Sequence, residues 1–372
     1  MFLTIILFLV LLSLLVLVHE FGHFITAKKF GVGVEEFGIG FPPRIAKFVR
    51  NGTTYSINAL PIGGFVRIKG DIADERDPEK LRAEDSFANK PFWKKTLMLF
   101  SGVGMNILFS MVVLTIGFLI GLPQVFDTPP DNGTIEDLGV RVTMIQDGSS
   151  ASLVNLQPGD QILSVNGTSI QSVEQLQRWI REHPDQQIEL AVEHKDTTET
   201  LTPRISRNET GEGILGVGLV LSGTVSYPIL TAIGLGIQTT FILLWEILKA
   251  FALIIVNLFS GISPGENVAG PIGIAVLTGQ VASLGFVYLL QFSALLSLNL
   301  AIFNLIPFPA LDGGRILFAV VEKIRGKALR QQVEGWIHQV GFFILLLLVL
   351  VITVRDVRSY SDRILEFFGS IF

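Results

Sequence analysis

Two histidines and a glutamate near the amino terminus have the types and the spacing of a hydrolytic zinc site. They stand in the run His19-Glu20-Phe21-Gly22-His23. Residues four apart share one face of a helix, so both imidazoles can bind one zinc ion, and the glutamate can take a proton from a water on that ion. The motif alone is weak, because it also arises by chance in soluble helices. A structural role, in which the three side chains reach the membrane interface, is the alternative.

The position of the motif favours the metal interpretation. Residues 1–18 carry no charge, and about 20 apolar residues are enough to cross a hydrocarbon core about 30 Å thick. Ionisable residues in such a helix cost roughly 2.5–3.5 kcal/mol each on insertion scales, and zinc binding offsets that cost. No Lys or Arg precedes the run and no A-x-A cleavage site follows it, so we expect a retained helix rather than a signal peptide.

A third ligand is needed, because catalytic zinc has three protein ligands and one open position. The other histidines are His183 and His194 in a soluble-looking segment and His338 at the start of an apolar run, and none is well placed. Asp312 directly follows an apolar run, in the stretch N-L-I-P-F-P-A-L-D-G-G of residues 304–314, where two prolines break the helix. By itself Asp312 fits a turn or a helix cap equally well, but beside the histidine motif it is favoured as the third ligand.

Several apolar runs must position these residues. The chain has 372 residues, of which 49% are hydrophobic and 16% charged, and its mean hydropathy is positive, so an ordinary soluble enzyme is excluded. It has no cysteine, which excludes disulfides, zinc ribbons and thiol catalysis. Runs that reach or approach the length of a membrane span lie at residues 1–18, 96–122, 229–258, 284–308 and 336–354.

The charge distribution predicts the orientation of these spans. Residues 24–95 hold 13 Lys and Arg against 9 Asp and Glu, whereas residues 122–228 hold 6 against 15. The positive-inside rule places the first segment in the cytoplasm and the second outside. If Asp312 meets the histidines on the cytoplasmic side, residues 229–283 cross the bilayer an even number of times. We therefore expect about four spans, with residues 229–258 along the outer interface or re-entrant.

Two segments between the spans are predicted to contain β structure. Residues 32–70 indicate short strands around an Asn51-Gly52 hairpin turn, which form a small membrane-associated sheet. The charged residues 71–90 are expected to form an exposed loop. Residues 123–227 combine Pro-Gly and Asn-Gly turns with a helix from about residue 173, which begins with a Ser172 and Gln175 capping box. They predict one inserted α+β domain.

The predicted fold is thus a polytopic α-helical membrane protein with a small sheet and one inserted domain. Its expected parts are an amino-terminal membrane core, the inserted domain, an interfacial or re-entrant linker and a carboxy-terminal membrane core, at residues 1–122, 123–227, 228–283 and 284–372. Within the second apolar run, Gly102, Gly104 and Asn106 suit close packing between helices.

Taken together, these motifs resemble the bacterial site-2 protease family over nearly the whole chain. The likeness is carried by HEFGH in the first run, the stretch of residues 304–314, and a PDZ-like Pro-Gly-Asp…Val-Asn-Gly pattern between them. It implies a zinc-dependent intramembrane endopeptidase, with Zn²⁺ held by His19, His23 and Asp312 and with Glu20 as the catalytic base. It also implies that Asn304 contacts the substrate near the scissile bond, although helix packing is an alternative role for that residue.

The same resemblance suggests a substrate site and a location. Gly38-Ile39-Gly40 and Gly63-Gly64 are similar to a membrane β-loop that pairs with an unwound substrate, the alternative being a purely structural hairpin. The implied substrates are single-span proteins already trimmed by another protease, such as anti-sigma factors or signal-peptide remnants. The implied location is the bacterial cytoplasmic membrane, with a PDZ domain on the extracytoplasmic side and no nucleic-acid partner. Some family members carry two PDZ domains, whereas residues 123–227 have room for one.

Two other functions stay open at this point. A gluzincin-like membrane protease that cuts soluble segments would use a glutamate as its third ligand, and Glu322 is the candidate. A catalytically inactive membrane PDZ adaptor is the non-enzymatic alternative, and the intact motif argues against it.

Overall fold

The computed structural model divides into two compact units. One, the membrane unit, comprises residues 1–116 with 233–372, and the other, the inserted domain, comprises residues 117–232. The structure describes residues 2–71, 78–126, 130, 132–194, 197–208, 210–260, 269–327 and 331–359.

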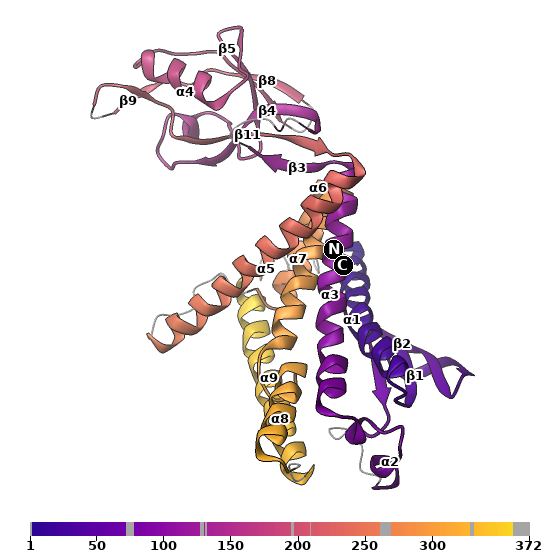
Figure 1. Cartoon of the computed structure of the whole chain (residues 1–372). Helices are drawn as coiled ribbons and strands as arrows, with labels where there is room; N and C mark the ends of the chain where they lie inside the picture. The colour runs from indigo at the N-terminus through magenta and orange to yellow at the C-terminus, as the bar shows by residue number, and fades with distance from the viewer. Residues whose placement is uncertain are drawn as a thin grey trace. The chain divides into compact units, whose positions relative to one another are not determined.

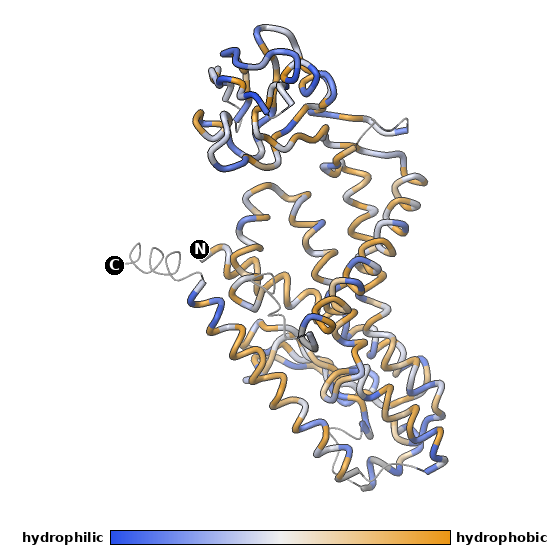
Figure 2. The backbone as a smooth tube through the Cα atoms, turned by 90° about the vertical axis from the view of Figure 1, so that its left-hand side faces the viewer, coloured by the Kyte–Doolittle hydropathy of each residue, from blue (hydrophilic) through white to orange (hydrophobic). Residues whose placement is uncertain are grey.

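Five helices are long and apolar enough to cross a membrane, and Figure 2 shows them as predominantly hydrophobic. They agree with the five apolar runs of the sequence, and two of them extend across the boundary between the units. Their bounds are α1 Phe2–Lys29, α3 Phe92–Ile120, α5 Ile229–Phe259, α7 Phe286–Leu305 and α9 Gln331–Ser359.

Within its described residues, the region expected to lie at the interface contains two helices. α5 is continuous over 31 residues, so the chain does not reverse direction within residues 229–259 and this segment is not itself re-entrant. A second apolar helix, α6 (Pro271–Leu284), has 14 residues and a length of about 21 Å, which is too short to cross the bilayer alone. Asp356 of α9 caps α6, because its carboxylate accepts hydrogen bonds from the amides of Gly270 and Gly273, at 3.3 and 2.7 Å.

The small sheet consists of two long bent strands rather than several short ones. β1 (Val34–Arg50) and β2 (Thr53–Ile68) are joined by Asn51-Gly52, both with positive φ as a tight hairpin turn requires. Residues 36–39 of β1 pair with residues 54–57 of β2 and also with residues 64–67. The last segment of β2 therefore forms an edge of the sheet, and β2 packs along α1 (Figure 1).

An ion pair holds the bend of β1. Arg44 donates to the carboxylate of Glu36 at 2.6 Å. Burial raises the pKa of Glu36, but hydrogen bonds from Ser56 and Arg44 outweigh this effect and hold the pKa below its usual value.

The expectation of an exposed loop at residues 71–90 is only partly right for its described part, where residues 79, 82, 84 and 89 are exposed. A short helix α2 (Pro78–Arg82) is followed by a 3₁₀ turn at Phe87–Asn89. The side chains of Asp71, Ser86 and Phe87 are buried. Phe87 packs with residues of α1 and α3 in one apolar cluster, so this residue anchors the segment to the membrane unit's core.

The inserted domain is built on an antiparallel sheet in the order β3-β11-β4-β5-β7-β8, with β6 paired to β5 beside this path. Helix α4 (Val173–Glu182) contributes Leu176 and Ile180 to the domain's core. Ser172 caps this helix as predicted, since its hydroxyl accepts from the amide of Gln175 at 3.1 Å. The strands are β3 Leu122–Val125, β4 Thr134–Ile145, β5 Gln161–Val165, β6 Thr168–Ser169, β7 Leu190–His194, β8 Thr197–Leu201, β9 Ser206–Arg207, β10 Gly213–Ile214 and β11 Val217–Ser226.

Candidate metal centre

His19, His23 and Asp312 converge on one point inside the membrane unit. The Nε2 atoms of the two histidines are 3.1 Å apart. The Oδ2 atom of Asp312 is 2.9 Å from His19 Nε2 and 3.2 Å from His23 Nε2. Both histidines are 6% exposed. The structure thus brings together, from opposite ends of the chain, the three residues that the sequence selected.

These distances fit a zinc ion. Ligand atoms at 2.0–2.1 Å from a tetrahedral zinc ion are about 3.3–3.4 Å apart, close to the three separations between these atoms. Two neutral imidazoles and one carboxylate are also a donor set of catalytic zinc, with a fourth position left for water. Among the described residues, Glu322 does not join this group, so the carboxylate beside the histidines is the aspartate.

Gly102 of α3 leaves the space that the two imidazoles fill. A Cβ atom at this position would lie 2.5 Å from His23 Nε2 and 2.7 Å from His19 Nε2. Gly22 allows the same close approach from the other side, because a Cβ there would lie 2.3 Å from the carbonyl oxygen of Ser101. Helices α1 and α3 therefore pack with their backbones close together at the site.

The backbone of α3 also orients one imidazole. His23 Nδ1 is 2.8 Å from the carbonyl oxygen of Met98. A carbonyl oxygen only accepts, so Nδ1 carries the proton and Nε2 keeps its lone pair for a metal. His19 Nδ1 in turn faces the side chain of Asn106, with 3.4 Å between Nδ1 and Nδ2.

Glu20 lies between the two histidines in sequence and is held by the sheet. Its Oε2 atom accepts a hydrogen bond from the amide of Val66 at 3.0 Å. Val66 belongs to the edge segment of β2, so the candidate base lies next to an edge of the sheet. A peptide added to this edge would lie beside the carboxylate.

Asp312 is placed by a tight turn that ends at the first residue of α8 (Asp312–Arg325). A Cβ atom on Gly313 would lie 2.3 Å from the carbonyl oxygens of Leu305 and Ile306, and one on Gly314 would lie 2.2 Å from that of Phe308. Only glycines therefore fit directly after the aspartate. Arg315, one turn into α8, pairs with the buried Asp71 and ties the helix to the segment that follows β2.

His338 of α9 supports the same turn rather than the metal group. Ala310 has a φ of 79°, a left-handed conformation that non-glycine residues rarely adopt. Its amide donates to His338 Nδ1 at 2.9 Å, and this bond holds the strained residue two positions before Asp312. Sequence reasoning excluded His338 as a ligand and gave no signal for this role.

We expect a His338→Leu variant to bind zinc more weakly, because the Ala310 amide loses its acceptor and the turn before Asp312 relaxes. The lost bond is worth about 1–3 kcal/mol. His338→Asn keeps an acceptor oxygen near the position of Nδ1 and should stay close to the wild type. Competition with a chelator on the purified protein measures both effects, and equal zinc affinity of the two variants would refute this role.

The other predicted residues lie on neighbouring elements. Asn304 is half-buried in the last turn of α7, and its side chain forms no hydrogen bond with any residue that the structure describes. Gly63 and Gly64 belong to the edge side of β2, and the amide of Gly63 donates to Ser13 Oγ of α1 at 3.0 Å. Gly38-Ile39-Gly40, in contrast, lies on the inner segment of the sheet, where residues 38 and 39 are paired on both sides.

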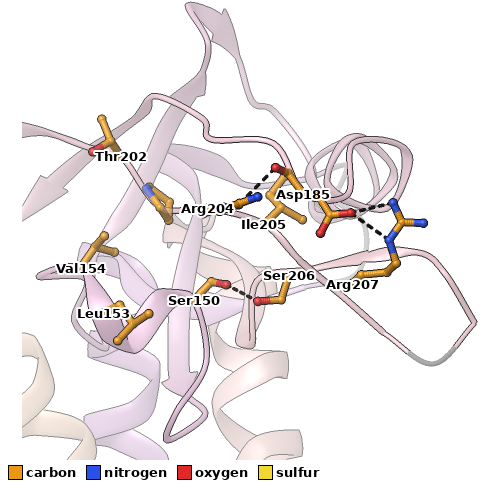
Figure 3. Close-up of a pocket in the computed structure, with 10 residues that line it drawn as sticks. Ser150, Leu153, Val154, Asp185, Thr202, Arg204, Ile205, Ser206 and Arg207 are labelled. Carbon is orange, nitrogen blue, oxygen red and sulfur yellow. Dashed lines mark hydrogen bonds and ion pairs between the residues drawn. The ribbon is translucent and has the colours of Figure 1, made fainter.

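The inserted domain holds the remaining candidates. His183 stacks on Trp179, and His194 bonds the buried Asp160 at 2.5 Å. A cavity of about 520 Å³ is also present there, lined by Asp185, Arg207 and eight further residues (Figure 3). Its polar groups bind each other, since Arg207 forms two hydrogen bonds to Asp185 and Ser150 bonds Ser206. We therefore assign no chemistry to this cavity.

Comparison with known proteins agrees with a zinc-dependent hydrolytic function. Residues 7–348 match the model of peptidase family M50. Zinc metalloprotease RasP of Geobacillus kaustophilus is 30% identical, over 96% of this chain and 98% of that protein. The regulator of sigma-W protease RasP of Bacillus subtilis is 28% identical (95% and 98%), and a putative zinc metalloprotease of Nostoc sp. is 31% identical (95% and 95%).

The structure and these matches together define a multi-pass membrane metalloprotease. The chain belongs to peptidase family M50, and Zn²⁺ is its expected cofactor. Among solved structures, the PDZ domain of an SdrC-like protein from Listeria monocytogenes is 20% identical, with a TM-score of 0.22, over 23% of this chain and 92% of that one.

Proposed function

We propose that the chain is a zinc-dependent endopeptidase that hydrolyses peptide bonds within transmembrane segments. The observation that carries this proposal is the convergence of His19, His23 and Asp312 at one point. Both histidines, with Glu20 between them, lie on α1, a helix long and apolar enough to span a bilayer. A peptide bond inside a bilayer has little contact with water. A buried site that can hold and activate a water molecule therefore suits substrates cut within their transmembrane segments.

The residues of the chain have separate tasks in this hydrolysis. His19, His23 and Asp312 hold the zinc ion, which when bound acts as a Lewis acid on water and on the scissile carbonyl. Glu20 accepts one proton of the attacking water, whose oxygen forms the new bond to the carbonyl carbon. The carbon–nitrogen bond then breaks, and Glu20 delivers the proton to the leaving amine. Asn304 donates to the carbonyl oxygen as negative charge develops there.

The substrate binds as an added strand on the edge segment of β2. A helical substrate hides its peptide bonds, so it must unwind before hydrolysis, and a sheet edge satisfies the freed backbone groups. The hydrogen bond between Val66 and Glu20 supports this edge as the one next to the catalytic groups. Gly63 and Gly64 contribute to it directly, whereas Gly38-Ile39-Gly40 contributes by supporting the edge from within the sheet.

The cellular setting follows from charge and from the relatives. We propose about four spans in a bacterial cytoplasmic membrane, with α5 along the outer interface and α6 as a short membrane-inserted helix. The acidic segment 123–227 is then a PDZ domain on the extracytoplasmic side. The sigma-W regulator of Bacillus subtilis supports membrane substrates such as trimmed, single-span anti-sigma factors. In the proposed domain organisation, the PDZ domain is followed by the linker at residues 228–283 and the carboxy-terminal membrane core at residues 284–372.

The test is cleavage of a one-span reporter with a short ectodomain by the purified protein in liposomes. We expect a cut inside the span, mapped by mass spectrometry, that stops when a chelator removes zinc and returns when zinc is restored. A matched reporter with a soluble segment in place of the span should remain intact. Cleavage of the soluble reporter alone would instead support the gluzincin-like alternative.

Zinc content tests the ligand set separately. Asp312→Ala should lose the bound zinc, because two histidines alone leave the ion with too few ligands. Glu322→Ala is the matched control and should retain one zinc per chain. The reverse result would reject Asp312 as the third ligand. Atomic absorption on the purified variants gives the count.

A further inference from the structure

Helix α3 contacts the two histidines through three residues of one face. Met98, Gly102 and Asn106 are spaced four apart, so they line one side of the helix. The carbonyl of Met98 bonds His23, Gly102 leaves room for both rings, and Asn106 faces His19. The two histidines are also four apart on α1, which lies beside α3 (Figure 1). Each ring therefore has its own partner on α3.

The Asn106 side chain is fully buried, with 0% exposure. Its amide nitrogen Nδ2 is 3.4 Å from His19 Nδ1, while its Oδ1 atom has no hydrogen-bond partner among the described residues. Buried side-chain oxygens of this kind almost always have a partner. The backbone carbonyl of the same residue accepts from Ser297 of α7 at 2.9 Å, so the position of Asn106 is fixed from a third helix.

The protonation of His19 decides which end of the amide can face it. A histidine that binds zinc through Nε2 carries its proton on Nδ1, which is then a donor. An amide NH₂ group cannot accept that hydrogen bond, whereas the amide oxygen can. Nitrogen and oxygen of an asparagine amide have nearly the same shape, so a half-turn of the group exchanges them at no steric cost.

We propose that Asn106 is a positioning residue for the zinc site, whose Oδ1 atom accepts a hydrogen bond from His19 Nδ1. This bond holds His19 in the tautomer that presents the Nε2 lone pair to zinc, and fixes the angle of the ring. It does for His19 what the Met98 carbonyl does for His23. This inference rests on the proposed ligand set. It adds to the zinc site a residue that touches neither the ion nor the substrate.

Zinc affinity tests the proposal without reference to proteolysis. Asn106→Leu keeps the approximate size of the side chain and removes the acceptor, so we expect zinc affinity to fall about 10- to 100-fold. Asn106→Asp retains an acceptor oxygen in either protonation state and should bind zinc as tightly as the wild type or more tightly. Ser110→Ala, a buried polar residue one turn further along α3, is the control and should leave zinc affinity unchanged.

Chelator competition gives the affinities, and cobalt substitution reports the geometry of the site through its visible absorption band. The band should change in Asn106→Leu and persist in Asn106→Asp, while thermal unfolding of the two metal-free variants is compared to exclude a general loss of packing. Wild-type zinc affinity in the Leu variant, or equal losses in the Leu and Asp variants, would overturn the proposal. Failure of Asp312→Ala to lose zinc would instead overturn the ligand set on which it rests.

Discussion

A Glu20→Gln variant is expected to lose about 10²–10⁴-fold in the rate of reporter cleavage while it keeps its zinc. The substitution preserves the size of the side chain and removes its ability to accept a proton, and general bases contribute rate factors of this order. The three proposed zinc ligands are untouched. The measurement is the single-turnover rate on the one-span reporter, together with zinc content.

The control for this experiment is an identical chemical change elsewhere. Glu246 lies on an exposed face of α5 and pairs with Lys249 at 2.7 Å, so Glu246→Gln should cleave at the wild-type rate. A Glu20→Gln protein that contains zinc and still cleaves normally would show that another group is the base. Loss of zinc together with activity would mean that Glu20 supports the site itself, and the assigned role would then be wrong.

Gly102→Ala should strongly weaken zinc binding and reduce proteolysis with it. The added methyl group would occupy the space of both imidazoles, at 2.5 Å from His23 Nε2 and 2.7 Å from His19 Nε2. Real carbon and nitrogen atoms do not approach so closely, so at least one ring must leave its position. We expect zinc affinity to fall on the order of 100-fold or more, since displacing a ligand costs at least as much as losing a residue that orients one.

Gly104 provides the matched control on the same helix. A Cβ atom there meets no atom of the described residues within 4 Å, and alanine also favours helix formation more than glycine. Gly104→Ala should therefore retain zinc and activity. Both variants are compared by chelator competition and by cleavage of the reporter. If the two alanine variants had the same zinc affinity and cleavage rate, the close contact at Gly102 would not be needed for zinc binding.

The metal-binding motif of the site was predictable from sequence, whereas the contacts that hold its side chains in place were not. His19, Glu20 and His23 form a short-range pattern that a single helix converts into a shared face. Asp312 was selected because it follows a broken apolar run and because the histidine motif needs a third ligand. The roles of Met98 and Val66 depend on which backbone atoms of other elements face α1, and no residue type at those positions signals such a contact.

The fold was likewise predictable where hydropathy determines it. The five apolar runs are helices, and the helix that begins after Ser172 was recognised from its cap. The division of residues 229–283 into two helices was missed, because α5 and α6 are both apolar and their separation depends on packing. The segment around Phe87 was misread as a loop because its charged neighbours mask one buried aromatic residue.

The distance along the chain between the two halves of the metal site has a consequence for biosynthesis. His19 and Asp312 are separated by 293 positions, and α1, the sheet, α3 and the inserted domain are all synthesised before the aspartate. A ribosome-bound intermediate with these elements has two imidazoles and lacks the carboxylate. Since such intermediates fold from the amino terminus onward, peptide-bond hydrolysis becomes available only after translation has passed α8. On the proposed ligand set, the growing chain therefore lacks a complete zinc site until that point.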